Sequence, residues 1–394
     1  MVILIRNSDS GNEEARNQTD IALKKMRDTK FPEKLLDQVL LGFEGNIDNV
    51  FSVIRVRKSP FEYEIMEKIS EWAERIARSA GSSASIERVV KKISVGGFTS
   101  NVGRALSTLC GRIQNVHLIG AFGLPKIKEI FQEQLTEIYQ CVLLSVGNPG
   151  LTDAYEFTDG KIMMVHFAGI NEPDWNQIIS QIGEDQLIEE FDSSRLWGIG
   201  YWASNPKMSQ IFIELQDRIF PSLSHSAKNK YIILDLADLR KKPRSQLKEL
   251  ATLLPRFEDH VQVVLLLNDL ELIDLGTFIA EKASTDPLNL TESIQKKLNL
   301  SFVISHGPKV ATIATENLQN IILNAYTSSP QFTTAAGDHF DAGVAYALLL
   351  DLPAEVLPLI GNCTTSFFVR KGVSPTPQDL QQFLSNYLKN IENG

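Results

Sequence analysis

The chain has 394 residues, of which 39 are Lys or Arg and 48 are Asp or Glu, giving a formal net charge of −9. Hydrophobic residues make up 43% and charged residues 22%, which is typical of a globular protein, and the near-average counts of 24 glycines and 16 prolines exclude collagen-like and low-complexity chains. The acidic balance argues against nucleic acid and anionic lipid as partners, and no apolar run reaches the ~20 residues that span a bilayer. We therefore expect neither a nucleic-acid nor a membrane partner.

The cysteines and the first residues indicate a compartment. Cys110, Cys141 and Cys363 are odd in number, far apart and without a CxxC spacing, which argues against a disulfide framework and a cysteine-rich zinc site. The first residues have a short apolar start without the basic region and long apolar region of a signal peptide. The sequence predicts a cytoplasmic protein.

The first elements along the chain predict an extension and the start of a larger domain. Residues 1–35 are polar with mixed charges and form a predicted N-terminal extension, and residues 36–394 form the predicted main domain. The apolar run 39–43 predicts a buried strand, followed by a polar turn at 44–48. The spacing of Ile65, Ile69, Trp72 and Ile76 then predicts an amphipathic helix.

The rest of the chain alternates strand-like and helix-like segments. Apolar strands are predicted at 116–119, 231–236, 261–267 and 301–305, with helices at 246–254 and 288–298. This alternation predicts an α/β fold with a mostly parallel sheet covered by helices on both faces. In such sheets ligands bind at the carboxyl ends of the strands.

Two segments break this pattern and predict a second, smaller sheet. Residues 51–57 alternate apolar and polar side chains, and residues 151–168 read as a hairpin that turns at Asp159-Gly160. Strands with one polar face belong outside the central sheet. We expect a lid from segments near 50–60 and 147–168.

The most informative stretch is TTAAGDHFDAG at 333–343, followed by an apolar helical pattern. Ala335, Ala336 and Gly337 allow backbone N–H groups to approach a ligand, and a helix N-terminus there attracts an anion. Asp338 is then placed to deprotonate a hydroxyl beside a transferring phosphoryl group. The structural alternative is that Asp338 caps a core helix.

This stretch resembles the C-terminal signature of the ribokinase-like (PfkB) carbohydrate kinases, and four further motifs follow the order of that family. They are Gly42–Asp48, which contains N-x-D; Gly96–Leu106, which begins G-G; Asn268–Glu271, which reads N-x-x-E; and Ser305–Gly307. The resemblance implies a three-layer α/β/α sandwich with a mostly parallel sheet and a small β-sheet lid. It also implies an ATP-dependent sugar kinase that uses Mg2+ and a small-molecule sugar substrate.

The resemblance implies a role for each matching residue. Asp338 would be the base, and the amides of Ala335, Ala336 and Gly337 would form the anion hole. The predicted sugar-binding residues are Asn46, Asp48, Gly96, Gly97 and Asn101. The predicted nucleotide-binding residues are Asn268, Glu271, Ser305, Gly307, Thr334 and Asn362, of which Asn268 and Glu271 would also hold Mg2+ through water.

Structural explanations remain open for several of these residues. Asp48 could be a turn former, Asn268 a strand-end cap, and Gly96-Gly97 a tight turn. Tyr201 and its neighbouring tryptophans could line the sugar, although core packing explains at least two of these three aromatic residues.

Some positions depart from the family pattern and leave alternatives. Phe332 replaces the usual aspartate, which puts potassium activation in doubt, and Val310 replaces a glycine of the nucleotide turn. The early GFEGNIDNV segment, the hairpin and the long extension resemble the ADP-dependent sugar kinases of the same superfamily, whereas N-x-x-E favours ATP. The alternatives are an ADP-dependent kinase and a non-catalytic sugar- or partner-binding member. Resemblance also suggests a homodimer formed through the lid.

Overall fold

The computed structural model describes residues 9–166, 169, 173–223, 229–279 and 284–392. Residues 167 and 168 of the predicted lid segment, and residues 1–8 of the predicted extension, lie outside the described residues. No helix in these ranges is long and apolar enough to cross a membrane.

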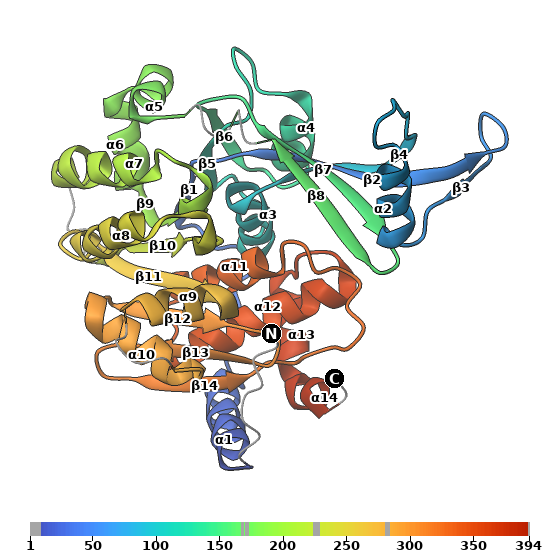
Figure 1. Ribbon diagram of the computed structural model, residues 1–394. Coiled ribbons are helices and arrows are strands. Elements are labelled where there is room, and N and C mark those ends of the chain that lie inside the picture. Colours follow the sequence, from blue (N-terminus) through green and yellow to red (C-terminus); the bar gives the residue numbers. More distant parts are fainter. Residues whose placement is uncertain (1–8, 167–168, 170–172, 224–228, 280–283, 393–394) are drawn as a thin grey trace.

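A nine-stranded sheet forms the centre of the molecule, with strand order β14-β13-β12-β11-β10-β9-β1-β5-β6 (Figure 1). Neighbouring strands from β12 to β6 are parallel, and β13 and β14 are added antiparallel at one edge. The strands are β1 (Gln38–Gly42), β5 (Val116–Gly120), β6 (Val142–Ser145), β9 (Ser194–Ile199), β10 (Tyr231–Asp235), β11 (Gln262–Asn268), β12 (Phe302–His306), β13 (Val310–Ala314) and β14 (Gln319–Leu323). The predicted α/β class and mostly parallel sheet are confirmed.

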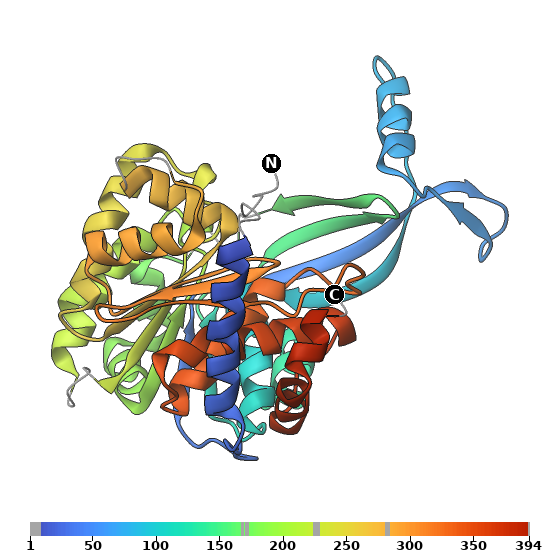
Figure 2. The same ribbon diagram turned by 90° about the horizontal axis from the view of Figure 1, so that it is seen from below.

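Helices cover both faces of this sheet, so its strands are apolar on both sides (Figures 1 and 2). One face packs against α1 (Asp9–Met26), α3 (Phe98–Cys110), α11 (Ala336–Leu349), α12 (Leu357–Lys371) and α13 (Pro377–Ser385). The other face packs against α5 (Trp175–Ile182), α6 (Glu184–Ser193), α7 (Met208–Glu214), α8 (Arg244–Phe257), α9 (Asp269–Ile279) and α10 (Pro287–Leu298). Two further short helices are α4 (Glu129–Phe131) and α14 (Tyr387–Glu392).

Helix α1, which begins within the predicted extension, is packed onto the central sheet. Ala22 and Met26 belong to the core of that face, and the Thr19 hydroxyl accepts a hydrogen bond of 2.9 Å from the backbone N–H of Leu323 in β14. The buried positions of α1 are few and separated by charged residues, which is why the sequence showed only a polar segment there.

A second, five-stranded sheet projects from the carboxyl-end edge of the central sheet and is called the lid (Figure 2). It consists of β2 (Asn46–Arg57), β3 (Tyr63–Ile65), β4 (Arg88–Gly96), β7 (Gly150–Phe157) and β8 (Gly160–His166). The predicted hairpin is present as β7 and β8. Helix α2 (Ile69–Arg78) packs Trp72 against Tyr155 and Phe157, with ring centroids 4.7 and 5.7 Å away.

Two details of the lid differ from the sequence predictions. The predicted polar turn at 44–48 is shorter, because Asn46 and Asp48 already belong to β2, where they pair with Gly150 and Thr152 of β7. Ile65 lies in β3 and not in α2. Pairing with β4 and β7 supplies backbone hydrogen bonds that a local polar pattern does not reveal.

Candidate active site

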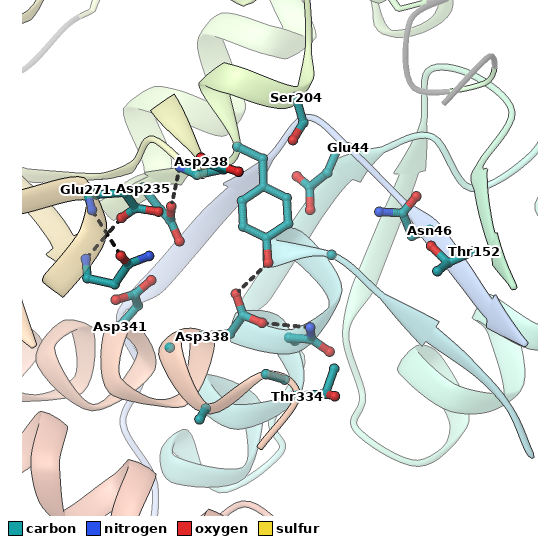
Figure 3. Close-up of a pocket in the computed structure, with 18 of the residues that line it drawn as sticks. Glu44, Asn46, Thr152, Ser204, Asp235, Asp238, Glu271, Thr334, Asp338 and Asp341 are labelled. Carbon is teal, nitrogen blue, oxygen red and sulfur yellow. Dashed lines mark hydrogen bonds between the residues drawn. The ribbon is translucent and has the colours of Figure 1, made fainter. Parts of the chain in front are cut away.

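A cavity of about 400 Å3 lies where the carboxyl ends of the central strands meet the lid and the start of α11 (Figure 3). Most of the predicted site residues line it, although they come from four separate segments of the chain. The predicted residues in its lining are Asn46, Asp48, Gly97, Asn101, Asn268, Glu271, Thr334, Ala335, Ala336, Gly337 and Asp338. This is the edge at which parallel α/β sheets bind ligands.

Asp338 lies in the first turn of α11, but it does not cap that helix. The N-cap position is Ala335, which has a left-handed φ of 65° and makes no side-chain cap. The Asp338 carboxylate instead accepts hydrogen bonds from Asn101 Nδ2 at 2.7 Å and from the Tyr201 hydroxyl at 3.1 Å (Figure 3). The side chain is therefore held across the cavity by two other segments, and the helix-cap alternative does not describe it.

The backbone at the start of α11 presents donors to the same space. The first N–H groups of a helix have no partner within the helix, and they carry the positive end of its dipole. The Ala336 N–H donates a long hydrogen bond of 3.3 Å to Thr333 O, so this amide already has a weak partner. The small side chains of Ala335, Ala336 and Gly337 leave this end of the helix open to the cavity.

On the lid side, glycines make room for carboxylates. Gly97 has φ 89°, and a Cβ added there would lie 2.7 Å from Glu44 Oε1. A Cβ added at Gly96 would collide with the carboxylate of Asp48. The two glycines therefore accommodate Glu44 and Asp48 at the cavity wall, which a simple tight turn would not require.

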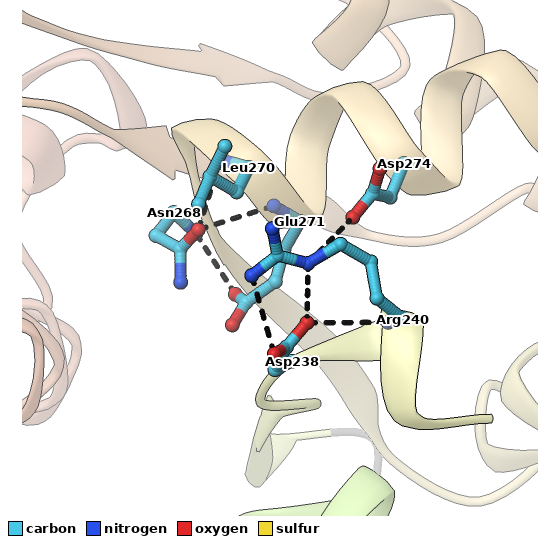
Figure 4. A network of polar contacts seen from close by, with 6 residues as sticks. All are labelled: Asp238, Arg240, Asn268, Leu270, Glu271 and Asp274. Atoms are coloured by element: carbon cyan, nitrogen blue, oxygen red, sulfur yellow. Dashed lines mark hydrogen bonds and ion pairs between the residues drawn. The ribbon is translucent and has the colours of Figure 1, made fainter. Parts of the chain in front are cut away.

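The N-x-x-E segment forms a reciprocal cap at the start of α9 (Figure 4). Asn268 Oδ1 accepts from the N–H groups of Leu270 and Glu271 at 3.0 and 3.1 Å, and Glu271 Oε2 accepts from the Asn268 N–H at 3.0 Å. Asn268, the last residue of β11, thus caps the start of α9, which is close to its structural alternative as a strand-end cap, while both side chains also line the cavity. Arg240 lies nearby, bound to Asp238 and Asp274.

Three carboxylates of the cavity wall lie close together. Asp235 at the end of β10, Asp338 and Asp341 offer oxygen atoms that lie within 4.8 Å of one another. Burial raises the pKa of Asp235 and of Asp341 well above the ordinary value, and the neighbouring carboxylates raise each further. Asp341 is 1% exposed, and its Oδ1 has no hydrogen-bond partner among the described residues.

This donor set fits Mg2+. Hard oxygen ligands are what Mg2+ selects, and it commonly keeps several waters, so directly and indirectly bound carboxylates both suit it. A divalent cation would also offset the mutual repulsion of the buried carboxylates, which otherwise favours their protonated forms. Asp235 and Asp341 could hold it directly beside Asp338, and Glu271, which lines the same cavity, could hold it through water.

Three predicted nucleotide-binding residues are not in the cavity lining. Ser305 is buried, and its hydroxyl is hydrogen-bonded to Thr312 at 2.6 Å. Asn362 is fully buried in α12. Gly307 begins a tight turn in which its N–H bonds Val310 O at 2.9 Å. The structure therefore places these three behind or beside the cavity.

Several cavity residues were missed by sequence reasoning. Glu44, Asp235 and Asp341 lie in the lining without having been assigned, and Tyr201 contacts Asp338 directly. Asp235 carried a usable signal, because it is a carboxylate at the end of a predicted parallel strand. Tyr201 was considered from the sequence only as one of three aromatic residues that could line the sugar, and its hydrogen bond to Asp338, which joins segments 137 residues apart, could not be read from local spacing.

A second, larger cavity of about 860 Å3 continues from the first beneath the lid. Asp48, Asn101 and Thr334 belong to the walls of both cavities. Lys161 of β8 reaches from the lid to the loop before α11, with its Nζ 3.4 Å from Thr334 Oγ1. The lid therefore touches the segment that leads into α11.

Comparisons with known proteins match most of the chain. A sequence model of the prokaryotic ketohexokinase family matches residues 15–387. A ketohexokinase from Haloferax volcanii is 33% identical over 353 residues, which cover 89% of this chain and 92% of that protein.

Solved structures with the same fold include two ribokinases. The ribokinase of Thermotoga maritima matches with a TM-score of 0.60 and 16% identity, over 89% of this chain and 100% of that one. The ribokinase of Arabidopsis thaliana, complexed with ribose and ATP, matches with a TM-score of 0.60 and 16% identity, over 88% of this chain and 98% of that one. The ribokinase-like fold predicted from the motifs is confirmed, and the chain is a carbohydrate kinase, a phosphotransferase with an alcohol group as acceptor. It belongs to the prokaryotic ketohexokinase family.

Proposed function

We propose that this kinase transfers the γ-phosphoryl group of ATP to a hydroxyl of a ketohexose, with Asp338 as the base. The observation that carries the proposal is the placement of the Asp338 carboxylate, which is 4% exposed and faces the cavity at the N-terminus of α11. The ketohexose is inferred from the Haloferax volcanii relative, and ATP from the N-x-x-E segment together with the nucleotide in the Arabidopsis thaliana ribokinase.

In the proposed reaction, the sugar hydroxyl gives its proton to Asp338 as its oxygen attacks the γ-phosphorus. The bond between that phosphorus and the β–γ bridging oxygen breaks, and ADP leaves with the electron pair. Burial raises the pKa of Asp338, which makes it a stronger base than an exposed aspartate, although the hydrogen bonds from Asn101 and Tyr201 oppose this shift. The N–H groups at Ala335–Gly337 would stabilise the charge that develops on the transferring group.

The remaining assignments follow from the cavity walls. Asn46, Asp48, Gly97 and Asn101 would bind the sugar, while Thr334, Asn268 and Glu271 would lie on the nucleotide side, with Asp235, Asp341 and Glu271 able to hold Mg2+. When bound, Mg2+ would neutralise charge on the nucleotide phosphates. Closure of the lid would exclude water and so limit hydrolysis of ATP.

We further propose that residues 36–394 form the kinase domain, onto which α1 packs, and that two copies pair through the lid. On the lid surface, Val90, Ile93, Leu151 and Met164 are exposed by 44–52%. Such apolar side chains on strands are suited to pairing with a second copy. Light scattering coupled to size-exclusion chromatography should give a dimer for the full chain and a monomer for Ile93→Glu/Met164→Glu, whereas a monomeric wild type would contradict the pairing.

The function is tested by steady-state assays of sugar phosphate formation with ATP or ADP as donor, Mg2+, and fructose, glucose or ribose as acceptor. We expect the highest kcat/KM with ATP and fructose. A higher kcat/KM with ADP would overturn the donor assignment, and a higher value with glucose or ribose would overturn the acceptor assignment. Binding of sugar and nucleotide without turnover on any pair would favour the non-catalytic alternative.

A further inference from the structure

Arg104 occupies an unusual position beside the sugar-binding side of the cavity. It lies on α3, one helical turn after Asn101, and it lines the larger cavity beneath the lid. Its Nη2 donates a hydrogen bond to Asn101 Oδ1, and no ion pair to a carboxylate is found for it among the described residues. A half-buried guanidinium without such a pair is costly to retain, which indicates a task other than packing.

The hydrogen bond to Asn101 determines which way the asparagine amide faces. An amide has an accepting oxygen at one end and a donating nitrogen at the other, and a guanidinium can only donate. Because Arg104 takes Oδ1, Nδ2 must point the other way, where it donates to Asp338 Oδ2 at 2.7 Å. The reversed amide would place its oxygen against the carboxylate and its NH2 group against the guanidinium, so both contacts would become repulsive.

The positive charge of Arg104 also acts on the carboxylates around Asn101. Asp48 and Asp338 both face this space, and burial raises the pKa of each, while the positive charge of Arg104 opposes that rise. Glu44 also lines the cavity, and the Tyr201 hydroxyl donates to Asp338. Arg104 is thus placed among the groups that would meet the sugar, without reaching Asp338 through a hydrogen bond of its own.

We propose that Arg104 is a positioning residue for sugar recognition, which holds the Asn101 amide with Nδ2 toward the acceptor site. The inference rests on the proposed function, since it assumes that a sugar binds where Asn101 and Asp338 meet. Arg104 then determines affinity for the sugar by acting through Asn101, and it leaves the nucleotide side unaffected.

A double-mutant cycle tests this coupling, using Arg104→Met, Asn101→Ala and the double variant, with KM for fructose and for ATP measured separately. Loss of a hydrogen bond to a charged group predicts a rise in KM for fructose of roughly 10- to 100-fold in Arg104→Met, with KM for ATP changed less than about 2-fold. Because Arg104 acts through Asn101, the double variant should lie within about 3-fold of Asn101→Ala. Arg104→Lys keeps the charge and can still donate to Asn101, so it should recover a large part of the loss.

The matched control is Arg112→Met, because Arg112 is exposed just beyond the end of α3 and stacks over Tyr139 outside the Asn101 contact. An unchanged KM for fructose in Arg104→Met, or multiplicative effects in the double variant, would overturn the proposal. A fall in melting temperature with equal rises in both KM values would show a packing role and would also overturn it.

Failure of the proposed function gives a different result. If the wild type does not phosphorylate fructose, that function fails, and the same cycle is then run on the calorimetric Kd of fructose without nucleotide. Non-additive loss of binding would still support the role of Arg104, whereas unchanged or additive affinities would reject it.

Discussion

Glu44 is the buried carboxyl whose effect on stability can be worked out most directly from the structure. It lies between β1 and β2, is 2% exposed, and its Oε1 accepts a hydrogen bond from the Thr99 N–H at 2.7 Å. The Thr99 hydroxyl donates to its other oxygen. Burial raises the pKa of Glu44 from 4.5 to about 7, and the nearby charge of Asp338 adds to the rise.

The raised pKa of Glu44 determines how the stability of the protein changes with pH. The folded state holds the proton more tightly than the unfolded state, so the protein loses stability as pH rises from about 4.5 to about 7. A difference of about 2.5 pKa units corresponds to about 3 kcal/mol. With an unfolding entropy of about 2 cal/mol/K per residue, this corresponds to about 4 °C in melting temperature.

We therefore predict that Glu44→Gln gains about 4 °C in melting temperature relative to the wild type when the pH is raised from 4.5 to 8. Glutamine can still accept from the Thr99 N–H, and the other buried carboxylates are present in both proteins, so the difference between the two curves isolates Glu44. Thermal unfolding across that pH range is the assay, with the exposed Glu133→Gln as control. Parallel curves for wild type and Glu44→Gln would refute the reasoning.

Three further predictions concern the cavity. Asp338→Asn should lower kcat by roughly 100- to 10,000-fold, as expected for loss of a general base. Its melting temperature at pH 7 should not fall, because burial raises the pKa of Asp338 and the charged form therefore costs stability; a lower kcat with a large fall in melting temperature would instead indicate a structural role. Gly97→Ala should destabilise the fold by about 1–2 kcal/mol in chemical denaturation, because φ is 89° and the new Cβ would meet Glu44; unchanged stability would contradict this contact. Glu271→Gln should raise the Mg2+ concentration needed for half-maximal rate while calorimetry finds the Kd of fructose unchanged, and an unaltered Mg2+ requirement would remove Glu271 from the metal site.

The contiguous motifs of the sequence were sufficient to predict the class of fold and one side of the site. Ala335, Gly337 and Asp338 adjoin one another in the chain, so a helix start places them together whatever else the fold does. Asn101 meets Asp338 across 237 residues, and Tyr201 meets it across 137. Contacts of this kind depend on the order of the strands in the sheet, which local spacing does not contain.

The sequence analysis predicted no strand at β4 of the lid, and the reason is similar. β4 contains Arg88, Lys91 and Lys92, which interrupt the apolar alternation. A register shift opposite Val50 and Phe51 also changes which of its side chains lie on the same face of the sheet. A bulge changes which side chains share a face, so an alternating pattern is broken at that point. The hairpin of β7 and β8 was predictable because its turn and both strands are consecutive.

The central claim is that the chain phosphorylates a ketohexose with ATP through Asp338. The most direct single measurement follows formation of fructose phosphate by mass spectrometry, with ATP and Mg2+, for the wild type and Asp338→Asn side by side. The account predicts continuous turnover by the wild type and a rate at least about 100-fold lower for the variant. Equal rates for the two proteins, or no fructose phosphate from a wild type that binds both fructose and ATP, would contradict it.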